Sequence, residues 1–362
     1  MAIQIGTATA QPGQIVYGTI DAVPLPTGGA DHFPVIIAQG YETSGPVLWL
    51  TANIHGNEYD GIGVIHDVVT PELPQILRGT VIAIPTLSPG GLRTGERSPY
   101  YLRGKDPNRL FPGLGETQYS NTTALEDAYA RLFADIQATA DLLLDLHDYG
   151  TRAIPFVFRD PVLYEHPRER TSAERLQQRV GEMLNALGLT VINEYVTEDY
   201  LKLNLHRSVS GSALNKARVP AVTIEIGGNR ALNVANVRAV AAGVRNVMRW
   251  AGMLPGPRET LDGITVIRPE YEVRRMMHPR VPVACLVHPL VEPGDWVKAG
   301  QPVARITDIY GRPIGTDSGL LTSDYDGFVM GLFPGMAAYE NDPFMGLAVR
   351  DAGEMVIELP KS

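Results

Sequence analysis

The chain has 362 residues, of which 44% are hydrophobic and 20% charged, a composition typical of a globular protein. The formal net charge is −9, and Lys and Arg occur singly rather than in blocks, which argues against a nucleic-acid-binding surface. No signal-peptide pattern and no run of eighteen apolar residues is found, so we expect a cytoplasmic protein without a membrane span. The single cysteine, Cys285, excludes an intramolecular disulfide, and its apolar neighbours favour a buried, inert thiol.

Up to residue 254, short apolar runs alternate with helical patterns. We expect buried strands at residues 47–54, 80–86, 141–147 and 220–227. Amphipathic helices are expected at about 125–136, at 171–187 with a Thr171–Glu174 capping box, and at 233–250. This alternation predicts an α/β fold with a mixed, largely parallel sheet and flanking helices.

The pattern changes at residues 254–257, Leu-Pro-Gly-Pro, after which turns separate short strands and no helix is expected. We therefore predict two domains, residues 1–254 and a small C-terminal all-β domain at 255–362. In the latter, residues 286–311 and then 323–329 resemble a biotinyl or lipoyl carrier barrel. Residues 322–326, where the tip of a carrier hairpin would lie, contain no lysine to be modified. A barrel reused as a lid or rim is therefore favoured over a modified carrier.

The strongest chemical motif is His55-Gly-Asn-Glu58, which directly follows the strand predicted at 47–54. Gly56 would permit a sharp turn here. Ligands gather at the carboxyl ends of strands in α/β sheets, and His147 ends another predicted strand. Two imidazoles and one carboxylate, with a position left open for water, are the ligand set of catalytic zinc. We therefore predict one zinc ion held by His55, Glu58 and His147.

Glu225 lies in the apolar sequence Thr-Ile-Glu-Ile-Gly, where an ionised carboxylate is costly unless it is paired or near a cation. It is either a general base beside the metal or a strand-end residue paired to an arginine, and we favour the former.

Residues 87–122 show no clear periodicity and contain Arg93, Arg97, Arg103 and Asp106-Pro-Asn-Arg109. Long irregular segments inside compact domains are usually functional, and arginine side chains bind carboxylates with two hydrogen bonds. The alternative, a set of solvated loop arginines, is favoured on composition alone. Among other histidines, His66 is expected on a helix surface, and His206 is a weaker candidate for a substrate contact.

Taken together, His-Gly-Asn-Glu at 55–58, Asn-Arg at 108–109, Asp-Leu-His at 145–147 and Thr-Ile-Glu at 223–225 resemble the succinylglutamate desuccinylase and aspartoacylase family of the zinc carboxypeptidase clan. The resemblance covers most of residues 35–250. Pro107 and Ser88 depart from the family, which usually has Leu and Asn at these places.

This resemblance implies a zinc-carboxypeptidase-like fold, with His55, Glu58 and His147 as the metal ligands. It also implies that Asn108 and Arg109 hold a substrate carboxylate, that Glu225 is the general base, and that Arg97 or Arg103 polarises the scissile carbonyl.

The favoured function is zinc-dependent hydrolysis of a small N-acyl amino acid, with no nucleic-acid or membrane partner and a possible homo-oligomer. A carboxypeptidase acting on peptides and a non-catalytic binding or carrier protein are the alternatives.

Overall fold

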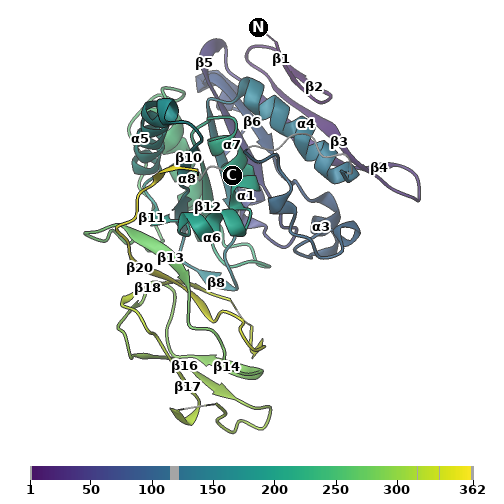
Figure 1. The fold of residues 1–362 in the computed structure, drawn as a ribbon. Coiled ribbons are helices and arrows are strands. Elements are labelled where there is room, and N and C mark those ends of the chain that lie inside the picture. The colour runs from purple at the N-terminus through teal and green to yellow at the C-terminus, as the bar shows by residue number, and fades with distance from the viewer. Residues whose placement is uncertain (1, 115–121, 316, 334, 360–362) are drawn as a thin grey trace.

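A computed structural model describes residues 2–114, 122–315, 317–333 and 335–359. Residues 115–121, which end the predicted irregular stretch, lie outside this description. Within the described residues a sheet of 13 strands dominates the fold, in the order β15-β18-β20-β13-β11-β9-β12-β7-β5-β6-β4-β3, with β8 paired to β18 (Figure 1).

Strands from the first 254 residues form the larger part of this sheet. They are β3 (Ile15–Pro24), β4 (Ala30–Gln39), β5 (Glu42–Ala52), β6 (Arg78–Ile84), β7 (Leu142–His147), β8 (Arg152–Ala153), β9 (Phe156–Arg159), β11 (Thr190–Asn193) and β12 (Ala221–Glu225). β1 (Ile3–Ile5) and β2 (Ala8–Ala10) form a separate hairpin, and β10 (Val162–Tyr164) pairs elsewhere.

The sheet is mixed rather than largely parallel. Strands β6, β5, β7 and β12 run parallel to one another, as do β9, β11 and β13. β9, however, is antiparallel to β12, and both ends of the sheet are built from antiparallel pairs. The alternation of strands and helices predicted the central parallel block. It did not reveal the antiparallel β9 or the long hairpin of β3 and β4.

Helices cover both faces of the sheet. α1 (Asp60–Val68) packs on α8 (Val234–Trp250), and α8 packs on α5 (Arg170–Leu187). On the other face lie α4 (Ala124–Thr139) and α7 (Val209–Asn215), which contact each other. The remaining short helices are α2 (Leu73–Ile76), α3 (Pro89–Thr94) and α6 (Thr197–Lys202).

The helix ends test the capping predictions. The Thr171–Glu174 capping box is wrong, because Pro167 starts a 3-10 turn at Pro167–Glu169 and α5 follows from Arg170, which leaves Thr171 inside the helix. The predicted C-terminal end is confirmed, since Gly188 has φ of 80° and directly follows Leu187.

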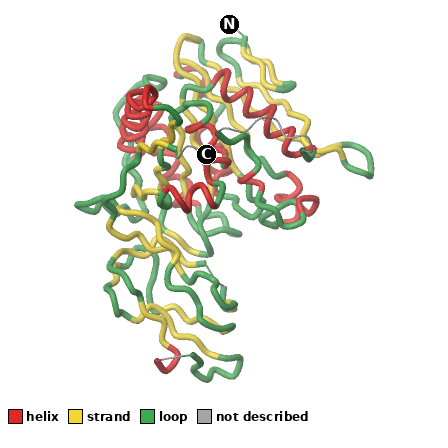
Figure 2. The backbone as a smooth tube through the Cα atoms, in the orientation of Figure 1, coloured by secondary structure: helices red, strands yellow, loops and turns green. Residues whose placement is uncertain are grey.

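The C-terminal residues form β-rich sheets (Figure 2). The strands are β13 (Val273–Met277), β14 (Cys285–Pro289), β15 (Trp296–Val297), β16 (Pro302–Thr307), β17 (Leu320–Thr322), β18 (Gly327–Leu332), β19 (Ala337–Ala338), β20 (Met345–Arg350) and β21 (Val356–Glu358). Over the described part of 255–359 the helical structure is one 3-10 turn, as the sequence predicted. Cys285 is buried, also as expected.

Some of these C-terminal strands form a separate sheet, and the others pair with strands of the first 254 residues or extend their sheet. β14, β16, β17 and β19 make a sheet of their own, far from β1 and β2 in Figure 1. β13, β20, β18 and β15 instead extend the main sheet beyond β11, and β21 pairs with β10. Hydrogen bonding therefore runs without a break across the predicted boundary at residues 254–255. No helix in the described residues is long and apolar enough to cross a membrane.

Candidate active site

The loop after β5 carries the His-Gly-Asn-Glu motif, and Asn53 shapes it. Asn53 has a positive φ of 51°, and its amide nitrogen donates to the backbone oxygens of His55 (3.1 Å) and Glu58 (2.7 Å). Thr86, just after β6, donates its hydroxyl to the Asn53 Oδ1 at 2.7 Å. This side chain therefore fixes the path of the whole ligand loop.

The expected sharp turn is present, since the backbone nitrogen of Glu58 donates to the backbone oxygen of His55 at 3.0 Å, but Gly56 has no positive φ in it and is needed for a second reason. A Cβ at this position would lie 2.0 Å from the carbonyl carbon of Gly91 in α3. Glycine is needed because two backbone segments touch here.

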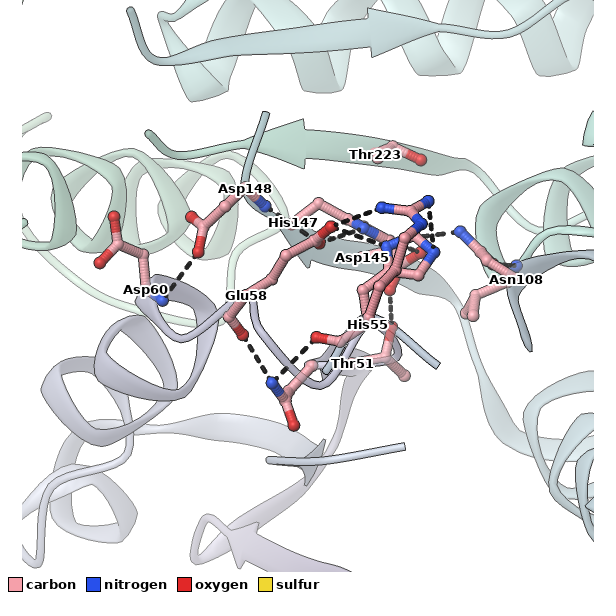
Figure 3. A network of polar contacts seen from close by, with 12 residues as sticks. Thr51, His55, Glu58, Asp60, Asn108, Asp145, His147, Asp148 and Thr223 are labelled. Carbon is pink, nitrogen blue, oxygen red and sulfur yellow. Dashed lines mark hydrogen bonds and ion pairs between the residues drawn. The ribbon is translucent and has the colours of Figure 1, made fainter. Parts of the chain in front are cut away.

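The three predicted metal ligands lie together, and all are buried (Figure 3). The Nδ1 of His55 is 2.8 Å from Glu58 Oε1, and the Nδ1 of His147 is 2.8 Å from Glu58 Oε2. One donor atom from each residue lies within 4.8 Å of the others, which suits a single metal ion. Two neutral imidazoles and a carboxylate form a donor set that zinc accepts.

The second ring nitrogen of each histidine, Nε2, contacts a carboxylate. The Nε2 of His55 is 3.0 Å from Asp106 Oδ1, and the Nε2 of His147 is 2.9 Å from Asp145 Oδ2. Thr51 in turn donates its hydroxyl to Asp145 at 2.7 Å. Such contacts would leave Nδ1 of both rings free to bind a metal ion and would raise the basicity of that nitrogen.

Burial opposes the charge on Asp106. The hydrogen bond from His55 and the positive charge of Arg97 outweigh that effect and hold the pKa of Asp106 well below its usual range. Asp106 and Asp145 were visible in the motifs, but the sequence did not assign them this role.

Glu225 ends β12 and pairs in register with His147 on β7, so the two side chains are neighbours. It is 7% exposed, and its Oε2 has no hydrogen-bond partner. Burial raises its pKa to about 8, with the charge of Glu58 adding to the effect and that of His147 opposing it. Within the described residues Glu225 is in no ion pair, in contrast to the alternative of a strand-end carboxylate paired to an arginine.

The two candidate arginines differ sharply in position. Arg97 donates to Glu58 Oε1 (3.2 Å) and Asp106 Oδ2 (3.2 Å), and its Nη2 lies 2.8 Å from His55 Nε2. Arg103 is exposed, has φ of 51° and does not line the cavity at the ligands. Of the two, only Arg97 lies where it could act on a group bound beside the metal.

Asn108 and Arg109 lie in the 3-10 turn Pro107–Arg109, which Asp106 caps by accepting from the backbone nitrogen of Asn108 at 2.9 Å. Asn108 faces His147, with Nδ2 3.4 Å from the ring Nε2. Arg109 donates to the backbone oxygen of Asn108 at 2.6 Å, and among the described residues it has no ion-pair partner within 4.0 Å. Its guanidinium is thus available for an anionic group.

The predicted site lies in one cavity of about 150 Å³, which is lined by His55, Glu58, His147, Glu225, Arg97, Asn108 and Arg109. The cavity is also lined by residues that the sequence did not single out, namely Tyr149, Phe158, Asp160, Glu194 and Arg275. Arg275 comes from β13 and donates to Glu194 Oε2 at 2.6 Å, and its guanidinium lies 4.6 Å from the ring centre of Phe158. Strand-end position could have flagged Asp160 and Glu194, but Arg275 belongs to no motif.

The secondary histidine candidates lie elsewhere. His66 is exposed on α1, as predicted. His206 lies in the 3-10 turn Leu205–Arg207, from which Leu205 lines the cavity and His206 does not.

A buried His-Glu-His set beside an unpaired carboxylate and two arginines is the arrangement of a metal-dependent hydrolase. Comparison with known families agrees, because residues 44–251 match the succinylglutamate desuccinylase/aspartoacylase catalytic domain. The chain belongs to this family, whose members are metal-dependent deacylases.

Individual relatives are distant. The N-alpha-acetyl-L-2,4-diaminobutyric acid deacetylase of Halomonas elongata is 24% identical over 82% of this chain and 78% of its own. A succinylglutamate desuccinylase/aspartoacylase structure from Rhodobacter sphaeroides is 21% identical, with a TM-score of 0.73 over 94% of this chain and 96% of that one. The product-bound ectoine utilization protein EutE (DoeB) of Ruegeria pomeroyi is 20% identical, with a TM-score of 0.72 over 92% and 95%. These structures share the fold.

Proposed function

We propose that this protein is a zinc-dependent amidohydrolase that removes the acyl group from a small N-acyl amino acid. The observation that carries the proposal is the pairing of the buried ligand set His55, Glu58 and His147 with the unpartnered carboxylate of Glu225 in one cavity. A purely structural metal site has no use for that carboxylate.

Bound zinc would supply a Lewis acid that polarises the scissile carbonyl and lowers the pKa of water toward neutrality. Glu225 would accept the proton of the attacking water on its free Oε2 and deliver it to the nitrogen of the leaving amine. Burial keeps the pKa of Glu225 raised, which makes it a stronger base than a solvated glutamate.

Arg97 would donate to the carbonyl oxygen as negative charge develops there, a role typically worth about 3–4 kcal/mol of transition-state stabilisation. Its guanidinium already lies against His55 and Glu58, so a small side-chain rotation would redirect it. Asn108 and Arg109 would hold the substrate carboxylate, because the half-buried Arg109 guanidinium has no ion pair among the described residues.

A small substrate is favoured because the cavity, about 150 Å³, lies below the roughly 300–1,000 Å³ of sites for drug-sized ligands. The name of one relative, the N-alpha-acetyl-L-2,4-diaminobutyric acid deacetylase, makes N-acetylated amino acids the first compounds to try.

The test is to assay the purified zinc protein against N-acetyl and N-succinyl amino acids and against dipeptides. We expect about one zinc per chain, release of a free amine from acyl amino acids, and loss of both zinc and activity in His55→Ala. Preferential cleavage of dipeptides would indicate a carboxypeptidase instead. Zinc content unchanged in His55→Ala would refute the ligand assignment.

A further inference from the structure

Three hydroxyl groups form a chain that connects two points of the cavity wall. Ser208, at the start of α7, and Thr223, on β12, both line the cavity. Ser210 of α7 lies between them, is 1% exposed and does not line the cavity. Its Oγ is 2.7 Å from Thr223 Oγ1 and 3.3 Å from Ser208 Oγ. One buried hydroxyl therefore links two hydroxyls that face the cavity.

The protons of this chain can be counted. Three hydroxyls supply three protons, and the further contact of the chain among the described residues is the backbone nitrogen of Gly211, which donates to Ser208 Oγ at 2.9 Å. Because Ser210 is buried, its proton needs an acceptor, so it donates to one neighbour and accepts from the other. One proton is left over, on either Ser208 or Thr223. The described residues offer it no acceptor, and it faces the cavity.

Asn108 provides a second free donor beside Ser208. Its Oδ1 accepts from the backbone nitrogen of Val209 at 2.9 Å, which leaves Nδ2 as the end that faces the cavity. Nδ2 lies 3.4 Å from His147 Nε2 (Figure 3), but that nitrogen donates its own proton to Asp145 when Nδ1 binds a metal ion. The amide protons of Asn108 are therefore free for a bound ligand.

The guanidinium of Arg109 lines the same cavity and has no ion pair among the described residues. Its turn, Pro107–Arg109, packs on the turn Leu205–Arg207, which leads directly into Ser208. A guanidinium, an amide and a hydroxyl are thus presented by two adjoining turns, and all three are donors without an acceptor. An anionic oxygen ligand such as a carboxylate matches such a set.

We propose that the Ser208 hydroxyl donates to the substrate carboxylate, as a third group beside Asn108 and Arg109. This inference rests on the proposed function, which supplies the carboxylate. Ser210 and Thr223 act as positioning residues: Thr223 donates to Ser210, and Ser210 donates to Ser208, so the free proton of the chain is on Ser208.

Ser208 is chosen over Thr223 because of what each adjoins. Ser208 directly precedes Val209, whose backbone nitrogen holds the Asn108 amide. Thr223 lies two residues before Glu225 on the same face of β12, and thus on the side of the general base.

The experiment uses the zinc-loaded full-length protein and compares an acid with its neutral counterpart. The acid is the N-acetyl amino acid that is hydrolysed fastest in the assay above, or N-acetyl-L-alanine if none is hydrolysed, and the counterpart is its α-carboxamide. The readout is the acid-to-amide ratio of kcat/KM. It is taken within one preparation, so partial folding or zinc loss cancels. Wild type should favour the acid by roughly 100-fold or more, because the amide leaves the guanidinium unmatched.

Ser208→Ala should lower this ratio by roughly tenfold, because a hydrogen bond to a charged group is lost, and the change should lie mainly in KM for the acid. The variant also loses the hydroxyl that accepts from Gly211 at the start of α7, which should lower its melting temperature. That structural effect acts on the acid and the amide alike and does not change their ratio.

Two further variants serve as controls. Thr223→Val keeps the side-chain shape and removes the other end of the chain. Ser210 then has only Ser208 as acceptor, so the acid-to-amide ratio should stay within about twofold of wild type. Ser212→Ala removes a buried hydroxyl of the same helix, which donates to the backbone oxygen of His206 at 3.5 Å and does not line the cavity. It should leave both the ratio and the activity as in wild type.

Hydrolysis with a ratio that Ser208→Ala leaves unchanged, or that Thr223→Val lowers as much, would overturn the role of Ser208 and leave the proposed function standing. An equal loss in Ser212→Ala would trace the effect to helix packing and overturn it as well. Calorimetric binding of the acid and the amide separates the two proposals. Absence of hydrolysis with tighter, Ser208-dependent binding of the acid would support the hydroxyl donor and overturn the proposed function. Equal binding of both compounds without hydrolysis would overturn both.

Discussion

Glu225 has one carboxylate oxygen without a hydrogen-bond partner and lies next to His147 in the sheet. Glu225→Gln keeps the shape of the side chain and removes the proton acceptor. We expect the variant to retain zinc and its melting temperature while kcat falls by roughly 10²-fold or more. Zinc content, melting temperature and kcat should be measured on the same preparation. A folded, zinc-loaded variant with kcat near that of wild type would contradict the role of general base.

The same residue predicts the pH dependence of wild type. A general base works in its ionised form, so kcat/KM should rise as the pH increases through the pKa of Glu225. Burial raises that pKa to about 8 without a metal, and the positive charge of bound zinc would lower it. The acidic limb should therefore lie above the ordinary value of 4.5 and below about 8. It should disappear or move in Glu225→Gln.

Substitutions of Arg109 test the proposal that Asn108 and Arg109 clamp the carboxylate of the substrate. Arg109→Ala should raise KM strongly, and Arg109→Lys should not restore it, because an ammonium group cannot make the paired hydrogen bonds of a guanidinium. Steady-state kinetics on an acyl amino acid and its neutral amide provide the measurement. Equal turnover of the acid and the amide by wild type would count against the clamp.

Residue-level prediction from the sequence succeeded where a motif lay at a strand end. His55, Glu58 and His147 meet as expected, because parallel strands β5 and β7 bring their carboxyl ends to one edge. Asp160, Glu194 and Arg275 were missed because they are far apart in the chain and each is an ordinary charged residue there. Only the antiparallel insertion of β9 and the joining of β13 to β11 bring them to the cavity.

At the scale of elements, the ligand loop depends on its contact with α3. Gly56→Ala would place a methyl group 2.0 Å from the Gly91 backbone, which has no flexible side chain to move away. We expect a loss of about 1–3 kcal/mol in unfolding free energy and weaker zinc retention. Thermal denaturation and metal analysis check this.

Gly181→Ala is the matched control. Gly181 lies in α5, and a Cβ there would have no atom within 4 Å. Alanine should stabilise the protein by roughly 0.5–1 kcal/mol at this position. Equal melting temperatures for the two variants would show that the close approach of the loop to α3 is not a constraint.

Elements with strong periodicity were predicted well, and those without it were not. α4, α5 and α8 and the strands β5, β6, β7 and β12 lie where the apolar pattern predicted them. Residues 87–114, without such a pattern, contain α3 and two 3-10 turns that are held by contacts with the ligand loop and the cavity. Local sequence does not encode such tertiary contacts.

At the scale of the whole molecule, the predicted boundary at 254–255 crosses a shared core. Phe156, Phe158 and Ile192 from the first part are buried against Val273, Phe328, Met330 and Ala348 from the second. A chain ending at Leu254 would expose these aromatic side chains and the free edge of β11, and it would also lose Arg275. We expect it to aggregate or to lack cooperative unfolding.

Sedimentation, near-ultraviolet circular dichroism and thermal denaturation test this expectation. A soluble monomer of residues 1–254 that unfolds cooperatively would show instead that the two parts fold independently, as the change of sequence pattern predicts.

The joining of β13 to β11 and β20 to β13 also has a consequence for synthesis on the ribosome. His55, Glu58 and His147 emerge early, whereas β20 ends at Arg350, over 150 residues after β11 ends at Asn193. At about 5–20 residues per second, the nascent chain would carry an unpaired, apolar edge for on the order of ten seconds. Early in that interval the metal ligands are already synthesised while the cavity still lacks Arg275. Chaperone binding to nascent chains of this protein should therefore concentrate between the release of β11 and that of β20.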